Sequence, residues 1–195
     1  MNKNILYLHG FNSSPLSEKA ELTRQYFAEH FSAINFYCPQ IVNTPKAAMA
    51  QLEQLIEQNS SQPCQWYFIG SSLGGYFATY LAEKYQGLAA VINPAVKPYQ
   101  LLDKYLGEQT NPYTEEVYQV TIDFIADLKS LEQVTLLKNN YLLMVQTGDE
   151  VLDYRQAIKF YQNAHLIKQE GGDHRFVNFE KMLPKITRFF NLNSL

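Results

Sequence analysis

The run Gly70–Gly75 places Ser72 in a setting that suits nucleophilic chemistry. An apolar stretch, 66–69, leads into this glycine-containing run, and a helical pattern over 73–85 leads out of it. Strand, sharp turn, serine and helix form the context of a nucleophile elbow, in which a serine hydroxyl is exposed for attack. The flanking glycines leave room for the turn, and the free N–H groups at the start of the helix favour developing negative charge. We therefore predict that Ser72 is a nucleophile.

A serine hydroxyl is a weak nucleophile without a base, and the position of His174 suits that role best. The chain contains four histidines: His9, His30, His165 and His174. His174 follows Gly171 and Gly172 on a loop after the last strand-like run, 166–169, so it can reach over the end of a sheet. His9 ends the first strand, where we expect it to brace the following loop through hydrogen bonds.

A carboxylate should complete this arrangement by orienting the histidine. In proteins with such an elbow, the acid lies between the serine and the histidine in chain order. Three carboxylates follow the buried strand pattern 141–146: Asp149, Glu150 and Asp153. Asp149 lies just past the strand end, where the functional groups of parallel sheets gather. Asp153 is better placed to cap the helix 154–161, and Glu150 is expected to be solvated. Loop geometry favours Asp149, and the other two stay open as alternatives.

The negative oxygen that forms during attack on a carbonyl needs N–H donors. One donor follows the nucleophile and is the Leu73 N–H, and the other comes from the loop after an early strand. Residues 5–8 form that strand, and His9 begins the loop. We predict an oxyanion hole made by the backbone N–H groups of Leu73 and Phe11, with Asn12 as the alternative to Phe11.

Strand-like and helix-like patterns alternate along the chain. We expect strands near 4–9, 34–38, 66–70, 88–93, 141–146 and 164–169, and helices near 16–30, 45–58, 73–85, 154–162 and 176–190. Ser14 and Pro15 are expected to begin the first helix as its cap and its first residue. The alternation predicts an α/β fold with a mostly parallel, doubly wound sheet of about six strands.

The composition limits the class of protein. A chain of 195 residues is the length of one domain, and 46% apolar residues can form a sizeable core. The net charge of −3 is too small to indicate a nucleic-acid partner. No apolar run approaches the ~20 residues of a membrane span. Cys38 and Cys64 lack metal-type spacing and are expected to be reduced thiols. Cleavage of a signal peptide would remove the predicted oxyanion loop, so we expect a cytoplasmic protein.

Five motifs carry a family likeness. They are His9-Gly10-Phe11-Asn12-Ser13-Ser14-Pro15, Gly70-Ser71-Ser72-Leu73-Gly74-Gly75, Asn93-Pro94-Ala95-Val96, Asn111-Pro112-Tyr113 and Gln146-Thr147-Gly148-Asp149-Glu150-Val151-Leu152-Asp153-Tyr154-Arg155-Gln156-Ala157. Together they resemble the YqiA-like bacterial esterases of the α/β-hydrolase superfamily, from Asn4 to about Phe190. The resemblance implies a compact serine esterase or thioesterase with nucleophile Ser72, acid Asp149 and base His174. By analogy with the superfamily, the strand order should be 2-1-3-4-5-6.

The segment 94–140 interrupts the alternation, because no strand pattern fits it. Two helical stretches, 101–106 and 115–131, indicate a small helical lid over 95–138, inserted into a single domain 1–195. The superfamily places its lid after this strand. Tyrosines and leucines of the segment are expected to form an apolar wall over Ser72, which would favour acyl groups of several carbons.

The sequence therefore predicts a serine hydrolase that cleaves small-molecule acyl esters or thioesters through an acyl-enzyme. A peptidase or perhydrolase on the same residues is the alternative enzyme, and a ligand-binding protein without turnover is the alternative of another class. We expect no cofactor. We also expect no metal, because the serine arrangement accounts for two members of the cluster Asp149, Asp153, Asp173 and His174. The oligomeric state is left open.

Overall fold

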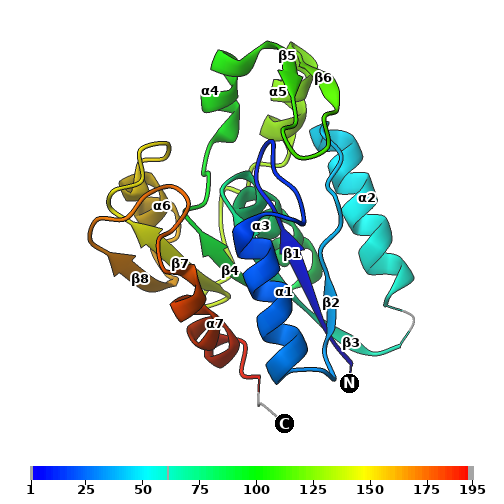
Figure 1. The fold of residues 1–195 in the computed structure, drawn as a ribbon, viewed down its shortest axis with the longest axis vertical. Helices are drawn as coiled ribbons and strands as arrows, with labels where there is room; N and C mark the ends of the chain where they lie inside the picture. Colours follow the sequence, from blue (N-terminus) through cyan, green and yellow to red (C-terminus); the bar gives the residue numbers. More distant parts are fainter. Residues whose placement is uncertain (1, 61, 193–195) are drawn as a thin grey trace.

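Six parallel strands form the central sheet of the computed structural model, which describes residues 2–60 and 62–192 (Figure 1). The strands are β1 (Asn2–Leu8), β2 (Asn35–Tyr37), β3 (Cys64–Ser71), β4 (Leu88–Ile92), β7 (Tyr141–Gln146) and β8 (His165–Gln169). Their order is β2-β1-β3-β4-β7-β8, and every neighbouring pair is parallel. Since β7 and β8 are the fifth and sixth strands of this sheet, the predicted order 2-1-3-4-5-6 is confirmed.

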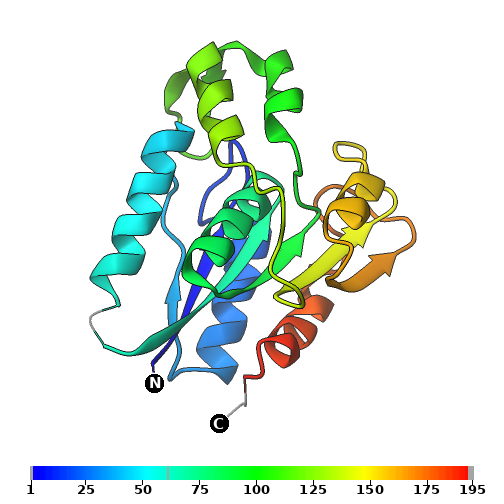
Figure 2. The same ribbon diagram turned by 180° about the vertical axis from the view of Figure 1, so that it is seen from behind.

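Helices cover both faces of the sheet (Figures 1 and 2). One face carries α1 (Glu18–His30) and α7 (Leu183–Phe189), and the other carries α2 (Pro45–Gln58), α3 (Leu73–Tyr85) and α6 (Tyr154–Phe160). Along β1, Ile5 and Tyr7 pack into the core under α1 and α7, whereas Leu6 and Leu8 pack into the core under α2, α3 and α6. Successive side chains of a strand point to opposite faces, so a strand that is apolar throughout must be covered on both sides.

The two helices on the α1 and α7 face of the sheet depart from their expected bounds. Ser14 does not cap α1; its hydroxyl accepts from the Leu16 N–H (3.0 Å) and its carbonyl accepts from the Ser17 N–H (3.1 Å). These bonds close a turn, so the helix starts at Glu18, later than expected. The expected helix 176–190 consists of a 3₁₀ turn, η2 (Phe179–Met182), followed by α7.

The insertion between β4 and β7 is only partly helical, which corrects the expectation that no strand fits this segment. It contains α4 (Pro98–Leu102), η1 (Asp103–Tyr105), β5 (Gly107–Thr110), β6 (Val117–Val120) and α5 (Ile122–Ser130). β5 and β6 form an antiparallel hairpin. The expected helix 115–131 starts only at Ile122, because the Thr121 hydroxyl caps α5 by accepting from the Phe124 N–H.

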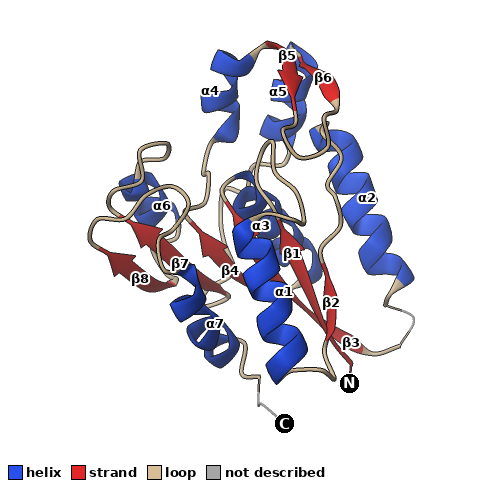
Figure 3. Ribbon diagram, in the orientation of Figure 1, coloured by secondary structure: helices blue, strands red, loops and turns tan. Residues whose placement is uncertain are grey.

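The insertion lies beyond the carboxyl ends of the sheet strands, at the top of the view in Figure 3. The Tyr76 hydroxyl of α3 donates to the Leu128 carbonyl of α5 at 2.7 Å, and Phe124 and Leu128 pack into the same core as α2 and α3. The insertion is thus attached to the sheet through α3.

Within residues 2–60 and 62–192, no helix is both long enough and apolar enough to cross a membrane. Cys38 and Cys64 are half-buried and free. The cytoplasmic location stays a prediction.

Candidate active site

Ser72 stands between the last residue of β3 and the first residue of α3. Its backbone has a positive φ of 56° with ψ −121°, an unfavourable combination that costs a non-glycine residue about 1–3 kcal/mol. Hydrogen bonds hold it there: the Ser72 N–H donates to the Ile92 carbonyl (3.1 Å), and its carbonyl accepts from the N–H groups of Gly75 (2.9 Å) and Ala95 (3.1 Å). The turn therefore presents the hydroxyl at the end of the sheet.

Glycines make this turn possible because backbone atoms approach them closely. A side chain at Gly74 would overlap the carbonyl of Leu8, and one at Gly70 would overlap the carbonyl of Gly74. The contact at Gly74 brings the end of β1 against the start of α3. As a result, a Cβ atom at Gly10 would lie 3.8 Å from the Ser72 Oγ.

The structure brings Ser72, His174 and Asp149 together, as the sequence analysis expected of their positions. The His174 Nε2 lies 3.1 Å from the Ser72 Oγ, and the His174 Nδ1 lies 2.9 Å and 3.0 Å from the two carboxylate oxygens of Asp149. The Asp149 side chain is only 1% exposed. Its Oδ1 also accepts from the N–H groups of Val151 and Leu152, so the loop itself fixes the carboxylate.

The competing carboxylates have other contacts. Asp153 caps α6, since its Oδ1 accepts from the Arg155 N–H at 3.0 Å. Glu150 is exposed, as expected of a solvated side chain, and its Oε2 also accepts from the backbone N–H of His174 at 3.0 Å. Neither carboxylate forms a hydrogen bond or ion pair with the imidazole ring, so Asp149 is the carboxylate that binds the His174 Nδ1.

The predicted oxyanion donors have no competing acceptor. The N–H groups of Leu73 and Phe11 make no hydrogen bond with any residue in the described part of the chain. Leu73 is the first residue of α3, where N–H groups lack an intrahelical partner. Asn12, the alternative to Phe11, is left-handed with φ 50°, and its Oδ1 accepts from the Tyr118 hydroxyl of the insertion at 2.7 Å.

His9 braces the loop that carries Phe11. Its Nε2 accepts from the Ile41 N–H at 3.0 Å, so the proton is on Nδ1, which donates to the Gly10 carbonyl at 3.1 Å. Burial lowers the pKa of the His9 imidazole, and the residue is only 4% exposed. A neutral imidazole whose two nitrogens are both hydrogen-bonded to the backbone suits the structural role expected from the sequence.

The insertion reaches the site through the same loop. The Phe11 ring packs edge-on against Tyr105 and Tyr118, with centroids 5.7 Å and 6.3 Å apart. The Asn111 Nδ2 donates to the Ser13 carbonyl at 3.1 Å. These contacts attach the insertion to the predicted oxyanion loop.

Sequence reasoning assigned no role to Asn93, a buried side chain that holds the histidine loop. Its Nδ2 donates to the carbonyls of Asp173 (3.0 Å) and His174 (3.3 Å), and its Oδ1 accepts from the Gln146 N–H (3.0 Å). Asn93 follows β4 directly and has φ 39°.

Gln146, at the end of β7, was missed in the same way. Its Oε1 accepts from the N–H groups of Asp173 (3.1 Å) and Val177 (2.9 Å). Its Nε2 donates to the Gln169 side chain and to the Val177 carbonyl, both at 2.8 Å. A polar residue that ends an otherwise apolar buried strand is the signal that could have revealed both residues.

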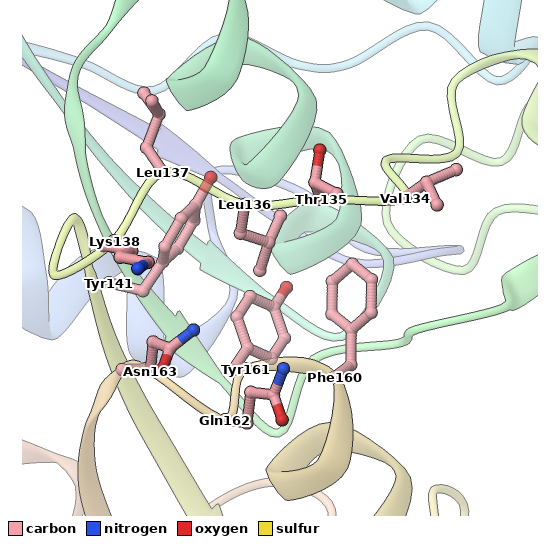
Figure 4. A pocket seen from close by; sticks show the side chains of 11 residues that line it. Val134, Thr135, Leu136, Leu137, Lys138, Tyr141, Phe160, Tyr161, Gln162 and Asn163 are labelled. Atoms are coloured by element: carbon pink, nitrogen blue, oxygen red, sulfur yellow. The ribbon is translucent and has the colours of Figure 1, made fainter.

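A pocket of about 150 Å³ opens beside Ser72 and His174. Its walls come from the loop after β1, the start of α1 and the loop of His174, and no residue of the insertion lines it. The expected wall over Ser72 is therefore not part of this pocket. A larger pocket of about 270 Å³ lies near the start of β7 and contains none of the predicted site residues (Figure 4). Within residues 2–60 and 62–192, no cluster of three or more His, Cys, Asp or Glu is arranged to hold a metal ion.

A parallel sheet of this order, with a serine on a sharp turn after its third strand, defines the α/β-hydrolase fold. The chain belongs to the YqiA-like family, because the family model described as "Uncharacterised protein family (UPF0227)" matches residues 4–191. The resemblance found in the sequence is thereby confirmed.

Solved structures of low sequence identity share the fold. Est1E from Butyrivibrio proteoclasticus has a TM-score of 0.72 at 12% identity, over 97% of this chain and 87% of its own. A monoacylglycerol lipase from Paleococcus ferrophilus has a TM-score of 0.69 at 12% identity, over 96% of this chain and 94% of its own. Mouse alpha/beta hydrolase domain-containing protein 10 has a TM-score of 0.68 at 15% identity, over 96% and 89%.

Proposed function

We propose that this protein is a serine hydrolase that cleaves carboxylic acyl esters or thioesters through an acyl-enzyme. The observation that carries the proposal is the 3.1 Å contact between the Ser72 Oγ and the His174 Nε2, with Asp149 against the other ring nitrogen. Nucleophile and base within hydrogen-bond reach, with the base oriented by a third group, is the geometry that activates a serine.

In this mechanism His174 transfers the Ser72 proton to the leaving group. Asp149 accepts the Nδ1–H of His174, which keeps Nε2 unprotonated and able to take the Ser72 proton. Ser72 attacks the carbonyl carbon, and the N–H groups of Leu73 and Phe11 stabilise the oxygen that becomes negative. His174 then protonates the leaving oxygen or sulfur. Water, deprotonated by His174, cleaves the acyl-enzyme and restores the serine.

The fold neighbours favour ester substrates over peptides. One of them is named a monoacylglycerol lipase. Peptide substrates also bring polar backbone groups, which are costly to bury unpaired, and the aromatic cluster of Phe11, Tyr105 and Tyr118 beside the loop offers little to pair them. We propose that residues 95–138 act as a lid of the single domain. Peptidase, perhydrolase and pure ligand-binding activity are the competing outcomes of the test.

A fluorophosphonate probe tests the proposal directly. The wild-type protein should be labelled on Ser72 and should hydrolyse p-nitrophenyl butyrate and butyryl-CoA. Ser72→Ala should lose the label and several orders of magnitude of turnover, since the rest of the site then acts without a nucleophile. Ser130→Ala, on an exposed serine of α5, is the control and should keep both. Near-normal turnover by a folded Ser72→Ala protein would refute the mechanism. A wild-type protein that is neither labelled nor active would support the alternative of a ligand-binding protein without turnover.

A further inference from the structure

The pocket beside Ser72 has a basic wall. Lys19 of α1 and Arg175, which follows His174, both line it. None of its lining residues is an aspartate or a glutamate. A concave surface with cations and no carboxylate favours a negatively charged group next to the nucleophile.

The Lys19 ammonium has no direct ion-pair partner among residues 2–60 and 62–192. It donates one hydrogen bond, to the Arg175 carbonyl at 2.8 Å. Burial lowers the pKa of this ammonium, while Glu18, Asp173 and Asp149 act to raise the pKa and Arg175 acts to lower it. A half-buried ammonium with two N–H donors to spare is a natural partner for an anion.

Arg175 has a different role from Lys19. Its Nη2 pairs with the Glu18 Oε2 at 2.9 Å, and both side chains are largely exposed. A neighbouring pocket of about 260 Å³ shares Lys19 and Arg175 but is also lined by Glu18, Asp173 and Glu180. Those carboxylates repel an anion, so only the side facing Ser72 suits one.

Uncharged donors complete this wall. Ser17 is the N-cap residue of α1, but its hydroxyl makes no capping hydrogen bond, and it lines the pocket together with Ser13. The start of a 13-residue helix also carries partial positive charge. Both features add to the effect of Lys19.

We propose that this pocket is a subsite for a carboxylate carried by the leaving group of the substrate, with Lys19 as the residue that determines this specificity. The proposal rests on the proposed hydrolase function. His174 borders the pocket, and the histidine must lie against the leaving atom in order to protonate it. The volume of about 150 Å³ equals that of roughly five water molecules, so the carboxylate must lie a few bonds from the scissile ester.

Matched esters test the subsite. The butyryl ester of 4-hydroxybutanoate carries a carboxylate on its leaving group, and the butyryl ester of 4-hydroxybutanamide is its neutral counterpart. Wild type should prefer the anionic ester in kcat/KM by about tenfold or more, the usual size of a hydrogen-bonded charge contact. Lys19→Met should reduce that ratio by about tenfold, and Lys19→Arg should retain a preference because the charge is kept. Lys185→Met, an exposed lysine of α7, makes the same charge change away from the pocket and should leave the ratio as in wild type.

Two further esters test on which side of the ester the anionic group binds and whether that group must be a carboxylate. A succinyl monoester of 4-hydroxybutanamide carries the carboxylate on the acyl side, and 3-(butyryloxy)propylphosphonate replaces the carboxylate by a phosphonate at the same position of the chain. A Lys19-dependent preference for either one over the carboxylate leaving group would overturn the assignment. An equal rate for the anionic and neutral butyryl esters, or an unchanged ratio in folded Lys19→Met, would overturn the subsite and leave the hydrolase proposal intact.

Binding without turnover separates the two proposals. On a Ser72→Ala background, 4-hydroxybutanoate should bind at least tenfold more tightly than 4-hydroxybutanamide, as measured by NMR titration, and Lys19→Met should abolish that difference. This result would support the subsite even if wild type hydrolysed neither ester. Equal binding of the two compounds would overturn it.

Discussion

Replacing Gln146 by leucine removes the side chain that fastens the His174 loop to the end of β7. Four hydrogen bonds disappear: two that Oε1 accepts from the backbone of Asp173 and Val177, and two that Nε2 donates to Gln169 and Val177. Three of the partners are backbone groups of the segment that carries His174. Leucine fills a similar volume but can satisfy none of them.

The loss of these hydrogen bonds lowers both the stability and the turnover of Gln146→Leu. A hydrogen bond of this kind contributes a net ~1 kcal/mol, and water can replace part of the set because the loop is only partly buried, so we expect a loss of about 2–4 kcal/mol. For a protein of this size, that lowers Tm by about 4–16 °C and leaves it folded. The larger consequence concerns His174, because a displacement of about 1 Å from Ser72 can reduce turnover about 100-fold.

The assay combines thermal unfolding with steady-state kinetics on p-nitrophenyl butyrate. Gln146→Leu should lower kcat by about 100-fold with a smaller change in KM, because the substrate pocket is lined mainly by other elements. Gln146→Glu keeps an acceptor for the two N–H groups and should fall between wild type and leucine. Gln169→Leu removes only the one bond to Gln146 and a long contact to the Met182 sulfur, so it should cost about 1 kcal/mol and leave kcat within a few-fold. Wild-type kcat in Gln146→Leu would refute the view that this side chain positions His174.

Three other outcomes are expected. Asp149→Asn should lower kcat by about 10³–10⁴-fold because the amide favours the wrong imidazole tautomer, whereas Asp153→Ala should cost only about 1 kcal/mol of stability as a lost helix cap; the reverse kinetic pattern would reassign the acid. The pKa of His9 is lowered on folding, so its contribution to stability is complete above the unfolded value of about 6.5 and is lost as pH falls below it. Urea unfolding from pH 7 to 5.5 should therefore show a weaker pH dependence in His9→Gln, and an identical dependence would contradict this. In a p-nitrophenyl ester series, kcat/KM should rise from acetate to at least butyrate if acyl chains pack against Phe11 and the insertion residues Tyr105 and Tyr118, each buried methylene adding ~0.8 kcal/mol. A flat or falling series would show that this aromatic cluster does not bind the acyl group.

The sequence alone was enough to predict the sheet and the turn that carries Ser72. The helices 45–58 and 73–85 have the bounds expected from their patterns, and the strand order matches the one expected by analogy. Apolar periodicity and glycine spacing are local properties of the chain, so they can be read without knowing what the elements pack against. The expected positions of His174 and Asp149 came from chain order and strand ends, and their catalytic roles stay proposals.

Tertiary structure decided what depends on contacts between distant residues. The β5–β6 hairpin was missed because its short strands lie mostly exposed in the insertion, where the sequence shows little apolar alternation. The sequence shows Asn93 and Gln146 only as polar residues at the ends of apolar strands, and packing decides that their side chains hold the histidine loop. In the sequence, Lys19 is one of several charged residues on a polar helix. The packing of α1 against the His174 loop places the Lys19 side chain in the pocket beside Ser72. Such roles arise only when the sheet brings strand ends and loops together, because hydrogen bonds and burial act over a few ångströms in space, whatever the separation along the chain.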